Sequence, residues 1–113
     1  MEDPAAHDAL DLTVRDRPEE GRYEATAAGR LAGIAAYRPR PGAVAFTHTE
    51  VLPEWEGRGV GGRLARGALD DVRARGLAAV PICPFIAAWI RRHPDYADLV
   101  PAGERHLIER RDG

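Results

Sequence analysis

Three side chains in this sequence combine a type that assists group transfer with a position that could use it: His48, Glu50 and Cys83. His48 and Glu50 are two residues apart, so the alternation of a strand predicts that they share one face with Val44 and Phe46. A histidine beside a carboxylate can relay a proton from a reacting group, directly or through water. Burial against an apolar strand would suit Glu50 to act as a base near neutral pH. The alternative is a structural histidine beside a solvated carboxylate.

Cys83 is the only cysteine, so the chain cannot form an internal disulfide. It ends an apolar run and precedes Pro84, a residue that is favoured in the first turn of a helix. A helix N-terminus stabilises a thiolate. Cys83 could therefore take part in catalysis. The alternative is a small buried apolar residue, which is a common role for a free cysteine.

The glycine-rich segment 56–62, with the sequence EGRGVGG, lies between an expected strand and an expected helix. The first backbone N–H groups of a helix have no partner within it, and together with the helix dipole they favour a phosphate or pyrophosphate. Glycine lets the backbone approach such an anion, and Arg58 and Arg63 add positive charge nearby. The segment lacks the ending of a Walker P-loop. A turn that binds nothing is the alternative.

The elements that would position these residues follow from hydrophobic periodicity and from glycine and proline. The sequence predicts strands at 10–14, 23–27, 31–37, 44–52 and 77–83, separated in the first half by turns at 15–21, 28–30 and 38–42. The last of these turns contains two prolines, which cannot donate to a central ladder. Helices are predicted at 61–75 and 85–92, and a last edge strand at 105–109.

The order of these elements predicts the fold class. Four strands joined by turns form an antiparallel meander, and the helical crossover that follows normally makes the fifth strand a parallel neighbour of the fourth. We therefore expect an α+β fold with a mixed central sheet and two main helices. A chain of 113 residues forms one domain, residues 1–113, of which 1–8 are expected to be flexible.

Composition excludes several classes of function. The net charge of −2 argues against general nucleic-acid binding, and all 16 basic residues are arginines, so no lysine can act as a base. No apolar run approaches the roughly 20 residues that span a bilayer, so no membrane association is expected. The N-terminus lacks the pattern of a signal peptide, so a cytoplasmic location is expected. No metal site is expected, because no ligands stand at metal-binding spacing.

Several stretches, taken in order, carry a resemblance to a known family. They are HTEVLP at 48–53, EGRGVG at 56–61, PIC at 81–83 and RHPDY at 92–96. Together they resemble the GCN5-related N-acetyltransferases (GNAT), and within that superfamily a short branch of minimal members. The resemblance covers about residues 14–99 and is strongest from 48 to 96.

This resemblance implies a sheet that is splayed open between its fourth and fifth strands. Acetyl-CoA, the implied cosubstrate, would lie in the splay, with its pantetheine pairing near Val51 and Leu52. Cys83 is the usual catalytic candidate of the short branch. His48 belongs to a recurrent motif of that branch, whereas the position of Glu50 varies within it. The implied acceptor is an amine, either a small molecule or a protein lysine, and we expect a monomer or weak homodimer. The pyrophosphate would take N–H bonds from the segment formed by Arg58, Gly59, Val60, Gly61, Gly62 and Arg63.

The sequence departs from the wider family in two places. Glu56 stands where Gln or Arg is usual, and this weakens the positive charge of the loop. Residues 15–23 are too few to hold the two helices that normally wall the acceptor site, which implies an open acceptor face. Tyr96 is expected to pack beneath the sheet, and Trp55 to cover either the adenine or the core.

Two alternatives to an acetyltransferase remain open on these residues. The first is a module that binds CoA or acyl-CoA without catalysis, because the glycine-rich segment supports binding equally well. The second is a regulatory interaction domain whose glycine-rich turn binds nothing.

Overall fold

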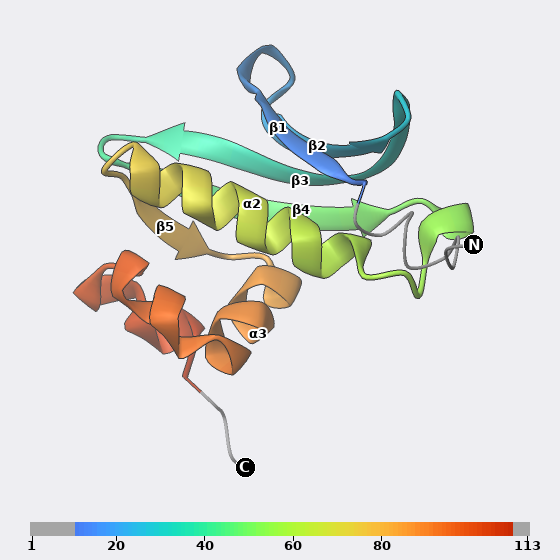
Figure 1. The fold of residues 1–113 in the computed structure, drawn as a ribbon. Coiled ribbons are helices and arrows are strands. Elements are labelled where there is room, and N and C mark those ends of the chain that lie inside the picture. The colour runs from blue at the N-terminus through green and yellow to red at the C-terminus, as the bar shows by residue number, and fades with distance from the viewer. Residues whose placement is uncertain (1–10, 110–113) are drawn as a thin grey trace.

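One mixed sheet of five strands forms the centre of the computed structural model, which describes residues 11–109 (Figure 1). The strands stand in chain order, with β1 to β4 antiparallel and β5 parallel to β4. This arrangement confirms the predicted α+β class. The strands are β1 (Thr13–Arg17), β2 (Arg22–Ala27), β3 (Arg30–Arg40), β4 (Ala43–Val51) and β5 (Ala78–Pro81).

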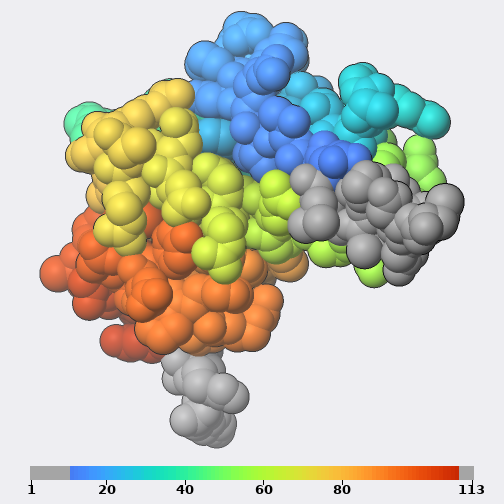
Figure 2. Space-filling model, in the orientation of Figure 1, coloured from blue at the N-terminus to red at the C-terminus, as the bar shows by residue number. Residues whose placement is uncertain are grey.

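Two α-helices follow the meander: α2 (Val60–Ala74) and α3 (Pro84–Arg92). Figure 2 shows α2 between the first two strands and the C-terminal segment that follows β5. None of the helices in residues 11–109 is long and apolar enough to span a bilayer. Four short 3₁₀ helices complete the described chain: Pro18–Glu20, Pro53–Trp55, Pro94–Leu99 and Ala102–Leu107.

The apolar face of α2 fills the core. Its buried residues recur at spacings of three and four, which is the periodicity of one helix face. The helix also approaches β1 closely at a glycine, because a Cβ added to Gly67 would lie 2.8 Å from the Cβ of Val14. The buried residues of α2 are Val60, Leu64, Ala65, Ala68, Leu69 and Val72.

A polar network ties the C-terminal end of α2 to the first three strands. The Tyr23 hydroxyl donates to Asp71 at 2.7 Å, and the Tyr37 hydroxyl donates to Asp16 at 2.6 Å. The Arg75 guanidinium lies 3.0 Å from the Asp71 carboxylate and 2.9 Å from the Asp16 carboxylate. The contact with Asp16 lacks hydrogen-bond geometry. Burial, reinforced by the bond to Asp16, raises the pKa of Tyr37 to about 12.

The predicted turn at 38–42 is wrong, because β3 continues through Arg40 and pairs with β4 as far as Ala43. The last residue of β3 that pairs with β2 is Ala36, so β3 is a local edge where Pro39 stands. Proline is tolerated at such an edge. The actual turn is confined to residues 41–42, where Gly42 has a φ of +70°.

The two ends of the described chain also differ from expectation. The first strand begins at Thr13 and runs to Arg17, because Pro18–Glu20 and the left-handed Gly21 reverse the chain within a few residues. Residue 10 and the expected flexible residues 1–8 lie outside the described range. The edge strand predicted at 105–109 is wrong, since most of it lies in the 3₁₀ helix Ala102–Leu107, which the amide of Ile108 closes on Arg105 O.

Candidate functional site

The fourth and fifth strands separate partway along β4. Their ladder runs from Ala43 paired with Ala78 to Phe46 paired with Pro81. One further bond, from the Cys83 N–H to the Phe46 carbonyl at 2.8 Å, closes it. Residues 47–51 of β4 therefore run on without a β5 partner (Figure 1). The expected splay is present, and it leaves an edge of β4 open for a ligand that can pair as a strand does.

A β-bulge in β4 decides which side chains enter this splay. Ala36 of β3 pairs with His48, and the next residue pairs with Phe46, so Thr47 is an extra residue. The bulge reverses the alternation, so that Phe46 is fully buried while the His48 side chain is 63% exposed. The prediction that these two residues share one face is therefore wrong.

His48 and Glu50 do come together, but outside the core. Their Nε2 and Oε1 atoms lie 3.5 Å apart, and the Glu50 side chain is 61% exposed. The burial that would have suited Glu50 to act as a base is absent. The pair can still exchange a proton with a group that approaches this exposed face of β4.

Cys83 lies at the apex of the splay. It is 3% exposed and forms the N-cap of α3, as the sequence predicted for a residue just before a helix. Its Sγ atom lies 3.3 Å from Oγ1 of Thr49, across the gap between β5 and β4. The structure records no hydrogen bond between the thiol and His48 or Glu50 within residues 11–109. The thiol and the His48–Glu50 pair are therefore separate groups.

Sequence reasoning missed Thr49. Without a bulge, Thr49 would face away from the core and His48 toward it. The quoted stretch 48–53 contains Thr49, but strand alternation gives no signal for the extra residue at Thr47.

The glycine-rich segment forms the start of α2, as predicted. Gly57 and Gly59 have φ values of +78° and +82°, and Gly59 is the N-cap of the helix. The first bond of the helix runs from the Arg63 N–H to the Gly59 carbonyl at 3.1 Å. The N–H groups of the first three helical residues, Val60–Gly62, therefore have no partner within α2. They are the donors that an anion at this helix end would use.

A cavity of about 390 Å³ opens beside these N–H groups, between the segment and α3. The Arg58 guanidinium lies 4.5 Å from the ring centroid of Trp55, which lines the cavity and also packs against the core. Arg92 lines it as well, a cation that sequence reasoning did not identify. The lining residues are Val51, Trp55, Glu56, Gly57, Gly59, Val60, Gly61, Gly62, Phe85, Trp89 and Arg92.

Two residues of the predicted cofactor site, Arg63 and Leu52, form hydrogen bonds with other parts of the chain. The Arg63 guanidinium donates to the Leu12 carbonyl at 3.1 Å, which directs it toward the start of β1. The Leu52 N–H donates to the Ala32 carbonyl at 2.9 Å, so it belongs to the β3 side of the strand. Arg63 therefore adds less charge to the cavity than its position in the sequence suggested.

Tyr96, which was expected to pack beneath the sheet, contacts α2 and Trp89 of α3. Its hydroxyl donates to Asp70 at 2.8 Å and accepts from Arg66 at 3.2 Å. Burial, then the bond to Asp70, raises the pKa of Tyr96. With its proton held by Asp70, this hydroxyl stabilises the fold. Within residues 11–109, no cluster of three or more His, Cys, Asp or Glu side chains could hold a metal ion.

A family model and two solved structures show similarity to this chain. A family model described as GCN5-related N-acetyl-transferase matches residues 22–99, whereas no curated protein matches the chain significantly. A solved GNAT family acetyltransferase from Brucella melitensis in complex with acetyl-CoA is similar at 25% identity, with a TM-score of 0.49 over 64% of this chain and 50% of that chain. The solved ribosomal-protein-S18-alanine N-acetyltransferase from Escherichia coli is similar at 21% identity. Its TM-score is 0.48, over 66% of this chain and 56% of that chain.

The chain spans about half the length of these two solved proteins, 50% and 56%. The family model matches a larger share of this chain than either solved protein does. The match includes four of the five strands and both α-helices. Since the model covers well over half of the residues, this protein belongs to the GCN5-related N-acetyltransferase family.

Proposed function

We propose that this protein transfers an acetyl group from acetyl-CoA to an amine, and that it belongs to the short branch that human N-acetyltransferase domain-containing protein 1 represents. One observation carries the proposal. The unpaired N–H groups at the start of α2 lie beside the open edge of β4, and a cavity adjoins both. An anion-binding helix end next to an unpaired strand suits a ligand that joins a pyrophosphate to an amide chain.

Different residues in and beside the cavity bind different parts of acetyl-CoA. The N–H groups of the segment 58–62 hold the pyrophosphate, with Arg58 and Arg92 as nearby charges. Gly59 supplies the positive φ that starts the helix, and Arg63 closes its first turn. The pantetheine amides pair with the open edge of β4 near Val51 and Leu52. No metal takes part in this scheme.

The chemistry needs three actions from the protein. The acceptor must lose a proton so that its nitrogen can attack, the oxyanion must be stabilised, and the departing CoA thiolate must gain a proton. The exposed pair of His48 and Glu50 takes the proton of the amine. Cys83, held by Thr49 at the apex of the splay, either protonates the thiolate or carries the acetyl group transiently. Holding both substrates in the splay supplies much of the rate.

A CoA-binding module without turnover is the second candidate. It is favoured by the separation of the buried thiol from the exposed His48–Glu50 pair. An initial-rate assay that measures both CoA release and acetylated amine by mass spectrometry distinguishes the two candidates. Acetyl transfer predicts equal amounts of both products, and loss of both in Cys83→Ala. Binding of acetyl-CoA without any acetylated amine would contradict transfer and support the module.

A further inference from the structure

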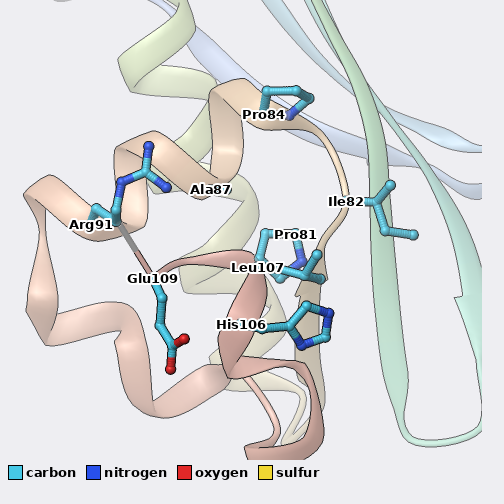
Figure 3. A pocket seen from close by; sticks show the side chains of 8 residues that line it. All are labelled: Pro81, Ile82, Pro84, Ala87, Arg91, His106, Leu107 and Glu109. Carbon is cyan, nitrogen blue, oxygen red and sulfur yellow. The ribbon is translucent and has the colours of Figure 1, made fainter. Parts of the chain in front are cut away.

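Helix α3 separates the cavity beside the glycine-rich segment from a second cavity of about 530 Å³ (Figure 3). The walls of the second cavity come from the end of β5, from α3 and from the C-terminal segment. Within the described residues, each cavity has one exposed, large apolar side chain near Pro84, where α3 begins. Ile82, in the second cavity, is 46% exposed, and Phe85, beside the glycine-rich segment, is 38% exposed. An exposed aromatic ring on a cavity wall is typical of a surface that a ligand covers.

The Phe85 ring lies against the start of α2. A Cβ added to Gly61 would meet three atoms of the ring, at 2.7, 3.3 and 3.4 Å. Gly61 does not have a positive φ, so its backbone conformation does not require a glycine. The close approach of the ring does require one. Phe85 therefore contacts one of the three residues whose N–H groups have no partner within α2.

The other apolar residues that line this cavity are less exposed than Phe85. Val60 and Trp89 are buried, and Val51 and Trp55 are half-buried. Because part of the Phe85 side chain stays in contact with solvent, the fold gains less from this ring than from a buried one. The ring is therefore the apolar surface that a ligand in this cavity would cover.

The order of chemical groups along CoA matches the order of these walls. In CoA the pyrophosphate is followed by the pantoyl unit, whose quaternary carbon carries two methyl groups, and then by two amides. One oxygen and one methylene separate that carbon from the nearer phosphorus, so the methyl groups lie close to any bound pyrophosphate. With the pyrophosphate on the N–H groups of Val60–Gly62 and the amides along β4 near Val51, the two methyl groups fall beside Phe85.

We propose that Phe85 recognises the pantoyl unit of acetyl-CoA by packing its ring against the two methyl groups. This inference rests on the proposed binding of acetyl-CoA. It makes Phe85 the residue that distinguishes CoA from nucleotides that share its pyrophosphate, because a nucleotide such as ADP has nothing to cover the ring. The contact is apolar, so its strength depends on the area of the side chain and not on charge.

Dephospho-CoA and ADP form a matched pair of probes, because dephospho-CoA is ADP extended by pantetheine. Titration of each into the isotope-labelled protein, followed through the amide NMR shifts, measures dissociation constants into the millimolar range. The amides of residues 60–62 report whether the pyrophosphate binds at the start of α2. We predict that Phe85→Ala weakens the binding of dephospho-CoA roughly tenfold and changes that of ADP by less than about twofold. Phe85→Leu keeps a large apolar side chain and should retain most of the affinity for dephospho-CoA.

Ile82→Ala is the matched control, because it removes the exposed apolar side chain of the second cavity. It should leave both dissociation constants unchanged. An equal loss of affinity for both ligands in Phe85→Ala would mean that the ring only supports the loop, and an unchanged affinity for dephospho-CoA would mean that the ring does not contact the ligand. Either result overturns the inference while the proposed function stands. A wild type that binds neither ligand overturns the proposed function and this inference together.

Discussion

At the scale of single residues, Thr49 and Cys83 form the contact on which the proposed chemistry depends. Their 3.3 Å contact joins β4 to the start of α3 just where the two strands have separated. The hydroxyl can fix the direction of the thiol and can share its proton. Because the Cys83 N–H is already bonded to Phe46, the thiol position is held from both the backbone and the side chain.

Replacement of Thr49 should therefore affect turnover more than binding. We predict that Thr49→Val lowers kcat roughly tenfold, the equivalent of losing one hydrogen bond worth about 1.4 kcal/mol, with the KM for acetyl-CoA unchanged. Thr49→Ser retains the hydroxyl and is expected to keep most of the activity. Initial rates at varied acetyl-CoA measure both constants. Equal activity of the Val and Ser variants would show that the hydroxyl has no such role.

The raised pKa of Tyr37 predicts how the stability of the fold changes at alkaline pH. Its pKa is about 12 in the folded protein, above the ordinary value of 10, first because of burial and then because of Asp16. A raised pKa means that the neutral hydroxyl stabilises the fold below pH 10, and that this contribution is lost as the pH rises from about 10 to 12.

The variant Tyr37→Phe isolates this contribution. It should lower the free energy of unfolding at pH 7 by about 1 kcal/mol, through loss of the bond to Asp16. It should also reduce the fall in stability above pH 10, and the remaining fall comes from Tyr23 and Tyr96, whose pKa values are also raised by burial. Urea unfolding at several pH values measures both effects. An identical pH dependence in the two proteins would rule out this role of Tyr37.

At the scale of elements, most strands and helices could be predicted, because hydrophobic periodicity and the positions of glycine and proline agree in most of these segments. The amphipathic pattern of α2 gave a helix at 61–75, and the structure has Val60–Ala74. The bulge at Thr47 could not be predicted, since it depends on how β4 pairs with β3 and not on its own residue types. That one extra residue moved His48 out of the core and brought Thr49 to Cys83.

The packing of α2 on β1 can be tested by adding a single methyl group. Gly67→Ala places a Cβ 2.8 Å from the stiff Val14 side chain, and we predict a loss of about 1–3 kcal/mol from this overpacking. Gly62→Ala in the same helix is the matched control, because its nearest neighbour atom lies at 3.7 Å. Denaturant unfolding compares the two variants.

Part of the loss should be recovered by shortening the opposing side chain. Val14→Ala removes the Cγ atoms that would lie 2.9 and 3.1 Å from the added Cβ but keeps the Cβ at 2.8 Å, so the double variant Gly67→Ala with Val14→Ala should lose less stability than the sum of the two single losses. If Gly67→Ala is as stable as Gly62→Ala, α2 does not approach β1 as closely as described.

At the scale of the whole molecule, the family could be predicted from the order of a few short stretches, and the family model supports it over residues 22–99. The sequence did not predict that α3 would separate two cavities. This separation depends on the C-terminal segment, where an edge strand was expected and a 3₁₀ helix stands instead. Because of that helix, Leu107 and His106 form a wall of the second cavity.

The short connection between β1 and β2 has a consequence at the same scale. The 3₁₀ turn Pro18–Glu20 and Gly21 are all that join these strands, so no α-helix stands between them. The proposed acceptor site therefore has to take its walls from other parts of the chain. The segment after β5 helps to form one cavity, whose lining includes Ile82 and Pro84, the neighbours of Cys83.

Binding of acetyl-CoA at the start of α2 is the central claim, and thermal unfolding with and without acetyl-CoA tests it most directly. The comparison includes Gly62→Glu, whose charge repels a pyrophosphate while favouring the N-terminus of the helix, and Gly62→Gln as its neutral control. We predict that acetyl-CoA at about 100 times its Kd stabilises the wild type by about 2.7 kcal/mol, the Gln variant by less, and the Glu variant hardly at all. A wild-type melting temperature that does not change with acetyl-CoA would contradict the account.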